Sequence, residues 1–206
     1  MKELNEKYGS EEPRKSSRKQ PIIREGEWTY DDYAALDDDN RYEIAGGKLE
    51  LMSPGPNLIH QMISSEMAGV LRQTCELDYI ILSAPLDVIL SPKEVRQPDL
   101  ILVRRDRMHI LSKRGIEGPP DLVVEILSPS TRRRDRIDKM KAYARYLVPE
   151  YWVVDPEAGA LEQYVLTDVR YELVNIYQGE DRVSSTSFPC VSFTMKEIMD
   201  TIPELD

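Results

Sequence analysis

The stretch from Gly118 to Tyr143 reads GPPDLVVEILSPSTRRRDRIDKMKAY. Its apolar run Leu122–Leu127 has the length of a strand, and an unbroken run of this kind is typical of a strand buried on both faces. Glu125 lies in the middle of that run. Burial of a carboxylate without a partner costs several kcal/mol or more of folding free energy, so Glu125 needs an oppositely charged partner or has a functional role. The run ends at the breaker Ser128–Thr131, and the local pattern predicts a strand followed by a turn and a helix.

The segment that follows, Arg132–Tyr146, has helical spacing. Its predicted inner stripe consists of Ile137, Met140, Ala144 and Leu147. Lys139 and Tyr143 lie four residues apart on a neighbouring face. The simplest interpretation gives Lys139 a surface salt bridge to Asp135, which is also four residues away. That interpretation explains the lysine well and Glu125 poorly.

Length and composition indicate one globular domain. A chain of 206 residues with 41% hydrophobic and 31% charged residues can bury one substantial core. We expect a flexible polar tail over residues 1–25 and a single domain over residues 26–206. The sequence has no apolar run of the roughly 20 residues that span a bilayer and no apolar signal core near its start. With only Cys75 and Cys190 and no paired motif, we expect a reduced cytoplasmic protein without a membrane partner.

The formal net charge of −10 disfavours a protein that coats long stretches of nucleic acid. It does not exclude a nuclease, because carboxylates that hold metal ions contribute negative charge themselves. Positive charge is local, with Arg132, Arg133, Arg134 and Arg136 at one predicted helix start. These arginines are either a solvated helix start or the binding site of an anionic partner, since positive residues oppose the helix dipole there.

A β-hairpin is predicted near the N-terminus of the domain. Arg41–Ala45 and Lys48–Met52 alternate around Gly46-Gly47, which suits a two-residue turn. In this register Glu43 lies directly opposite Glu50, and like charges in that arrangement are destabilising. Either both side chains are solvated or a nearby cation makes the pair tolerable. We favour Glu43 pointing into a site with Glu50 near its edge.

A longer helix is predicted from Asn57 to about Thr74, and His60 lies near its start beside the apolar stripe. Such a histidine is more often structural than functional, and the alternative is a proton shuttle or a substrate contact. A short capped helix is expected after Thr29 and a last one after Thr194. Further strands are expected at Tyr79–Leu82, Leu86–Leu90, Pro98–Val103, Glu150–Asp155, Leu161–Leu166 and Tyr171–Tyr177, whereas Ser91–Gln97 and Arg104–Gly118 are expected to be links.

Two of the strands carry acids that would meet. QPDLILV begins at Gln97 and contains Asp99, and the central strand contains Glu125. If these short strands pair, the two carboxylates form a site for a hard divalent cation such as Mg²⁺, which prefers oxygen ligands. Lys139 could then orient a bound water or stabilise charge on phosphorus, and Glu43 could complete the acidic cluster.

At this point the sequence resembles a known family. The blocks YEI-GG-LELMSP, His60, QPDLILV, GPPDLVVEILSPST, then Asp135, Lys139 and Tyr143, and finally PEYWVVDP are similar to those of the Uma-type restriction endonucleases. These bacterial proteins are placed in the PD-(D/E)XK nuclease superfamily. The resemblance covers about Trp28 to the C-terminus and implies an α/β (α+β) restriction-endonuclease-like fold, with a mixed β-sheet flanked by helices.

The resemblance also implies an activity, namely Mg²⁺-dependent cleavage of nucleic acid, with Mn²⁺ as a possible substitute and a homodimer as the working unit. DNA is the expected substrate, and the choice between DNA and RNA stays open. Asp99 and Glu125 would be the catalytic, metal-binding acids. The superfamily motif expects a lysine two residues after the second acid, where this chain has Leu127, and Lys139 on the following helix is the replacement. The expected substrate contacts are His60, Arg132, Arg133 and Tyr143, although Tyr143 could equally be a packing residue.

Two other functions remain open. The missing lysine and the net charge of −10 fit a catalytically degenerate nuclease fold that acts as a nucleic-acid or protein binding module. A carboxylate-rich hydrolase of small phosphoesters is a weaker alternative. A shared fold does not decide among these functions, so the geometry and chemistry of the site have to distinguish them.

Overall fold

The computed structural model describes residues 24–52, 55, 57–129 and 131–203, so the expected tail lies almost wholly outside the described residues. The elements, in chain order, are α1 (Tyr30–Ala34), β1 (Tyr42–Ala45), β2 (Lys48–Leu51), α2 (Leu58–Cys75), β3 (Tyr79–Ser83), β4 (Val88–Ser91), β5 (Glu94–Arg96), β6 (Leu100–Arg104), the 3₁₀-helix η1 (Arg105–Ile110), β7 (Leu111–Ser112), β8 (Gly115–Glu117), β9 (Leu122–Ile126), the π-helix η2 (Arg134–Lys139), α3 (Met140–Arg145), β10 (Glu150–Asp155), β11 (Ala160–Thr167), β12 (Arg170–Gln178), β13 (Arg182–Val183), β14 (Phe193–Thr194) and α4 (Met195–Met199).

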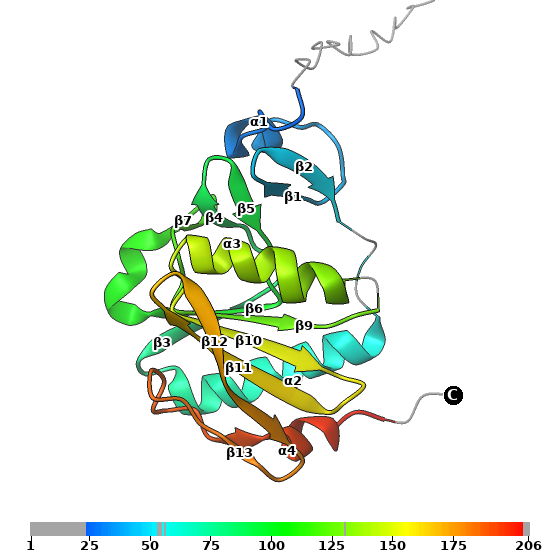
Figure 1. Cartoon of the computed structure of the whole chain (residues 1–206), viewed down its shortest axis with the longest axis vertical. Helices are drawn as coiled ribbons and strands as arrows, with labels where there is room; N and C mark the ends of the chain where they lie inside the picture. The colour runs from blue at the N-terminus through cyan, green and yellow to red at the C-terminus, as the bar shows by residue number, and fades with distance from the viewer. Residues whose placement is uncertain (1–23, 53–54, 56, 130, 204–206) are drawn as a thin grey trace, which may run out of the picture.

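Two mixed sheets of six strands each form the framework (Figure 1). One has the order β12-β11-β10-β9-β6-β3, and the other has the order β2-β1-β5-β4-β8-β7. Only β9 with β10 and β4 with β8 run parallel within these sheets; the other neighbours are antiparallel. The expected mixed sheet flanked by helices is therefore confirmed, and the predicted hairpin proves to be the edge of a second sheet.

The central strand β9 is buried on both faces, as its apolar run predicts. Leu122, Val124 and Ile126 belong to the core cluster on the α2 side, whereas Val123 and Leu127 belong to the cluster that contains α3 residues. Each face of the sheet thus has its own apolar core, and side chains alternate between them along the strand. Glu125 follows the alternation to the α3 side.

The hairpin β1-β2 has the predicted register, with Ile44 opposite Leu49 and Glu43 opposite Glu50. Its turn depends on glycine, since Gly47 has φ +83°, a conformation that costs other residues strain. A Cβ on Gly47 would lie 2.2 Å from the carbonyl oxygen of Gly26, and Trp28 N donates to the Gly47 carbonyl at 2.9 Å. The close approach fixes the start of the domain onto the turn.

The three capped helices begin where the sequence predicts. Thr29 and Thr194 both form capping boxes, at the starts of α1 and α4, and Asn57 caps α2 by accepting from His60 N at 2.9 Å. Among the described helices, none combines the length and apolar character needed to cross a membrane.

The predicted stripe of the helix after residue 131 is confirmed at Ala144 and Met140 and wrong at Ile137 and Leu147. Ile137 is 41% exposed and Leu147 is 55% exposed, whereas Asp135, Lys139 and Tyr143 are buried. Arg132 and Arg133 are α-helical, the π-helix η2 follows, and the α-helix resumes at Met140. Its inner side faces Glu125 rather than only apolar neighbours, so a charged stripe is buried beside part of the expected apolar one.

Two stretches expected to be links contain strands. β5 lies within Ser91–Gln97 and joins β1 to β4, and β7 and β8 lie within Arg104–Gly118. Glu94 and Arg96 of β5 are both buried, and Arg96 Nε donates to Glu94 at 2.8 Å. Because these charges neutralise each other, a polar segment can form an inner strand.

The expectation of unpaired cysteines is also wrong. Cys75 at the end of α2 and Cys190 before β14 form a disulfide, with their Cα atoms 5.2 Å apart, a normal separation for this bond. The cysteines are 115 residues apart in sequence, so composition alone gave no sign of their proximity. The bond ties α2 to the C-terminal segment.

Candidate active site

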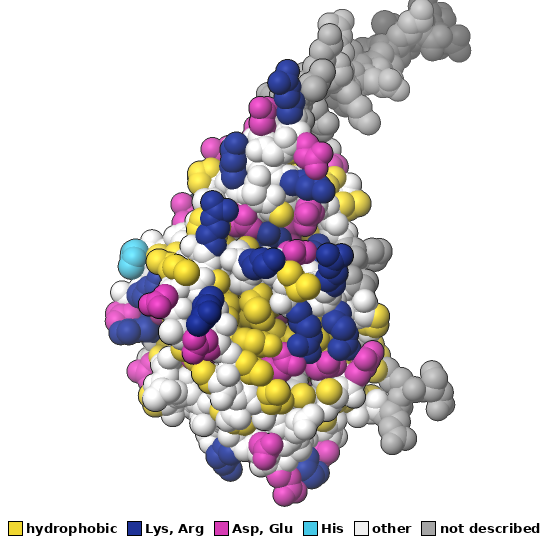
Figure 2. Space-filling model, in the orientation of Figure 1, with side chains coloured by type: hydrophobic (Ala, Val, Ile, Leu, Met, Phe, Trp, Pro, Cys, Tyr) yellow, Lys and Arg dark blue, Asp and Glu magenta, His cyan; other side chains and the backbone are white. Residues whose placement is uncertain are grey.

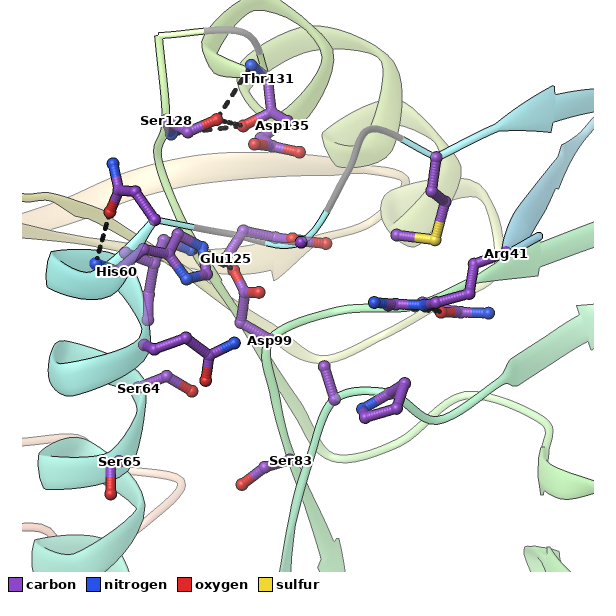
Figure 3. Close-up of a pocket in the computed structure, with 18 of the residues that line it drawn as sticks. Arg41, His60, Ser64, Ser65, Ser83, Asp99, Glu125, Ser128, Thr131 and Asp135 are labelled. Atoms are coloured by element: carbon purple, nitrogen blue, oxygen red, sulfur yellow. Dashed lines mark hydrogen bonds and ion pairs between the residues drawn. The ribbon is translucent and has the colours of Figure 1, made fainter. Parts of the chain in front are cut away.

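Strands β6 and β9 bring Asp99 and Glu125 together. They pair antiparallel with Leu100 opposite Val124, so Asp99, the residue before β6, lies next to Glu125 at the end of this pair of strands. Asp99 Oδ2 accepts from the backbone N–H of Ile126 at 2.7 Å. Both acids line one cavity of about 510 Å³, and Figure 3 shows them side by side between α2 and the Ser128–Asp135 segment. The predicted pairing of the two acid-bearing strands is confirmed.

Lys139 reaches the same point from the helix. Its Nζ lies 2.9 Å from both carboxylate oxygens of Glu125, 3.3 Å from Asp135 Oδ1 and 3.4 Å from Glu43 Oε1. The side chain is only 3% exposed. Burial by itself lowers the pKa of Lys139, but Glu125 and Glu43 outweigh it, and the pKa lies above its usual value. The ammonium therefore stays charged, and the expected pair with Asp135 is a buried contact.

Glu43 comes from the hairpin and is completely buried. Its carboxylate accepts from Gln97 N at 3.0 Å and from Arg96 Nη1 at 3.4 Å, and Arg134 Nη2 lies 3.8 Å away. Burial raises the pKa of Glu43, yet Lys139 and Arg96 lower it more, so the net shift is downward. Of the two alternatives for the hairpin, the one with a nearby cation is correct. Glu43 is not among the residues that line the cavity. It therefore pairs with the side chains of Arg96 and Lys139 behind the cavity wall and does not face the open space.

Glu125 has the opposite electrostatic balance. Burial raises its pKa well above the usual value, and Asp135 and Asp99 add to the rise against the lowering effect of Lys139. Tyr143 donates its hydroxyl to Glu125 Oε1 at 2.8 Å. Burial and the neighbouring carboxylates thus disfavour the charged form of Glu125, and Lys139 is the group that opposes them.

His60 approaches Asp99 from the first turn of α2. Its Nε2 lies 3.2 Å from Asp99 Oδ2, and its buried Nδ1 has no hydrogen-bond partner in the described part of the chain. Burial lowers the pKa of His60, but the hydrogen bond and charge of Asp99 raise it further, and the net shift is upward. His60 therefore holds Asp99 Oδ2 and leaves Oδ1 towards the cavity.

We expect the pKa of His60 to lie above 6.5. In an Asp99→Asn variant this pKa should fall, because the negative charge that raises it is gone and burial still lowers it. A histidine with a raised pKa contributes stability that is fully present below its unfolded pKa and is lost as pH rises through the folded one. Proton NMR of the imidazole measures the shift, and a His109→Asn variant assigns the signal, since the chain has two histidines. An unchanged pKa in Asp99→Asn would contradict the pairing.

Three predicted substrate contacts lie away from the cavity. Arg132 binds Asp155 at 2.7 Å and Glu157 at 2.8 Å, Arg133 is exposed outside the lining, and Tyr143 is completely buried beneath Glu125. None of the three is on the lining of the cavity, so the structure does not bring them together with Asp99 and Glu125 there. The arginines that line the cavity are Arg41, Arg72 and Arg134. Arg134 follows from its place in the basic run, whereas no sequence signal distinguished Arg41 or Arg72.

The donor set fits a hard cation with few protein ligands. In the described ranges no group of three or more His, Cys, Asp or Glu residues is arranged to hold a metal ion. Mg²⁺, however, commonly takes one or two carboxylates together with waters and substrate phosphate. Asp99 Oδ1 has no hydrogen-bond partner among the described residues, and Glu125 lies on the same cavity lining. These two carboxylates are suited to such an ion.

The outer surface shows no broad basic face in the view of Figure 2, where acidic and basic side chains alternate around an apolar middle. The net charge of −10 agrees with this distribution. The cavity lining itself contains both signs of charge, with Arg41, Arg72, Arg134 and Lys139 beside three carboxylates.

Fold and site together define a nuclease-type architecture, in which a mixed sheet presents two acids and a lysine at one cavity. The family model named Uma2 and described as "Putative restriction endonuclease" matches residues 29–196, and the chain belongs to this family. A solved structure described as a "putative nuclease belonging to DUF820 from Anabaena variabilis" has the same fold, with a TM-score of 0.68 at 19% identity. The match covers 84% of this chain and 97% of that one. No curated protein matches the chain.

Proposed function

We propose that the chain is a Mg²⁺-dependent endonuclease that hydrolyses phosphodiester bonds in DNA. The observation that supports this most is the meeting of Asp99, Glu125 and Lys139 at one cavity wall, in a chain of a restriction-endonuclease family. Two such acids with an adjacent lysine are what metal-assisted phosphodiester cleavage requires.

Each residue has a proposed role. Asp99 and Glu125 hold the cation, and when bound this ion polarises the phosphodiester and lowers the pKa of an attached water. Lys139 orients the attacking water and stabilises the charge that develops on phosphorus. Arg134 and Arg41, both on the cavity lining, bind the neighbouring phosphates. His60 keeps Asp99 in its orientation, a contribution that is usually worth about 10–100-fold in metal affinity or activity.

A homodimer is part of the proposal, because cleavage of both strands of a duplex is simplest with two sites. Sedimentation or light scattering with and without a short duplex tests this directly. A monomer under both conditions would restrict the proposal to cleavage of one strand at a time.

A specific observation favours a second function, that of a nuclease fold that binds without cutting. Lys139 already contacts both oxygens of Glu125, and the motif position of the lysine is held by Leu127, which is buried. A lysine fixed in that position could replace the cation permanently. Such a protein would bind nucleic acid or a protein partner without turnover.

We expect plasmid DNA and short duplexes to be cut in Mg²⁺ or Mn²⁺, and Asp99→Asn and Glu125→Gln each to reduce the rate at least about hundredfold, as loss of one strong electrostatic contact at a reacting phosphate does. Gel assays at fixed protein concentration measure the rate. Asp106→Asn is the matched control, since Asp106 is an exposed acid paired with Arg104. Cutting that persists unchanged in both site variants would mark a contaminant, and metal binding without cutting would support the second function.

A further inference from the structure

Lys139 occupies the position that a cation would need. An ammonium has three N–H donors, and two are directed at the oxygens of Glu125, each at 2.9 Å. Nζ also lies 3.3 Å from Asp135 Oδ1 and 3.4 Å from Glu43 Oε1, in ion pairs without hydrogen-bond geometry. A divalent ion on Glu125 would meet this positive charge at close range, and like charges so close repel strongly in a buried site.

Asp135 is a carboxylate that the proposed reaction has not yet used. It is 2% exposed and lines the cavity, and its Oδ1 has no hydrogen-bond partner among the described residues. A buried polar atom left without a partner needs an explanation. Figure 3 shows the side chain on the cavity wall, on the segment that begins at Ser128.

The π-helix η2 holds Asp135 in this place. Its residues Arg134–Lys139 carry both Asp135 and Lys139, and Tyr151 donates its hydroxyl to the Asp135 carbonyl at 2.9 Å. π-helical turns are rare and occur frequently at functional sites. The turn keeps Asp135 Oδ1 at ion-pair distance from the ammonium, 3.3 Å from Nζ, while Lys139 donates its hydrogen bonds to Glu125.

We propose that Asp135 is a positioning residue that receives Lys139 when a divalent cation binds. In the cation-free state Lys139 neutralises Glu125. When the ion binds at Asp99 and Glu125, the ammonium leaves Glu125 and is held by Asp135 and Glu43, with a donor directed at the cavity. The inference rests on the proposed metal site and adds to it a lysine that competes with the metal.

Calorimetric titration with Mn²⁺ alone tests this exchange without any substrate. Lys139→Gln, which keeps a donor and removes the charge, should bind Mn²⁺ at least about tenfold more tightly than the natural protein, since a repelling charge a few ångströms away is gone. Asp135→Asn should weaken Mn²⁺ binding, because the displaced ammonium loses a partner, but far less than Asp99→Asn does, and it should lower kcat at unchanged KM. Equal affinities of the natural protein and Lys139→Gln would overturn the exchange.

Two further outcomes separate the alternatives. If Asp135→Asn loses Mn²⁺ binding as Asp99→Asn does, Asp135 is a ligand and the positioning role is wrong. If neither the natural protein nor Lys139→Gln binds Mn²⁺, the proposed metal site fails together with this inference. A crystal soaked in Mn²⁺ provides the second measurement, which does not depend on the folding of a variant. Nζ should then lie at hydrogen-bonding distance from Asp135 Oδ1 and away from Glu125, and an unmoved Nζ beside a bound ion would refute the proposal.

Discussion

Lys139→Met is expected to lower the free energy of unfolding by about 3–5 kcal/mol, the usual cost of removing one partner from a buried ion pair. The ammonium lies within 3.4 Å of Glu125, Asp135 and Glu43. These carboxylates are almost fully buried, so without Lys139 they keep their charge at a high cost or take up protons. Urea denaturation with EDTA present measures the loss, and added Mn²⁺ should recover part of it, since a ligand that binds only the folded state stabilises it.

The pH dependence of this loss has a definite sign. A carboxyl whose pKa is raised in the folded state, as that of Glu125 is, binds protons that the unfolded chain has released, so stability falls as pH rises above the unfolded value. Removal of Lys139 strengthens this effect, and the deficit should be larger at pH 8 than at pH 5. Lys141→Met is the matched control: this lysine is exposed on the same helix, and its loss should change stability by no more than about 0.5 kcal/mol. Equal losses in the two variants would show that the charge cluster contributes nothing.

Replacement of both Cys75 and Cys190 by alanine is expected to cost about 4–5 kcal/mol, by the chain-entropy estimate for a cross-link of this length. The bond joins residues 115 positions apart, so it removes much of the freedom of the unfolded chain. Reduction of the natural protein with dithiothreitol should lower the denaturation midpoint by a similar free energy.

The double alanine variant is also the control for that experiment, because its midpoint should not respond to reductant. A thiol titration under denaturing conditions, before reduction, shows how the cysteines exist in the purified protein. If the natural protein has two free thiols, and its denaturation midpoint is the same with and without reductant, the bond does not form in solution. The sequence-based expectation of reduced cysteines would then hold after all.

Much of the site was accessible from the sequence, because local patterns determine it. Alternation around Gly46-Gly47 predicted the hairpin register, and two short apolar strands, each with one acid, predicted that Asp99 and Glu125 would be neighbours. In both cases a side-chain period of two residues fixes which face a residue occupies. Charge placed against the pattern, as at Glu125, was the most informative signal.

The remainder depends on contacts between distant segments. β5 is built from a buried Glu94 and Arg96 that satisfy each other, so its composition resembles that of a loop. The π-helical turn Arg134–Lys139 places Asp135 and Lys139 on the buried side of the helix. A pattern of 3.6 residues per turn does not predict such a turn. The disulfide and the cavity arginines Arg41 and Arg72 likewise depend on tertiary packing.

The two-glycine turn has a consequence for how this chain can vary. Glu43 and Ile44 are neighbours, both fully buried, with opposite surroundings: the one meets Lys139 and Arg96, the other the apolar cluster with Tyr30 and Val95. A single inserted or deleted residue at the turn would shift Lys48–Leu51 by one position against β1, so that Leu49, which lies opposite Ile44 and packs against this cluster, would turn to the other face. Homologues and engineered versions should therefore keep the length of this hairpin even where they alter its outer residues.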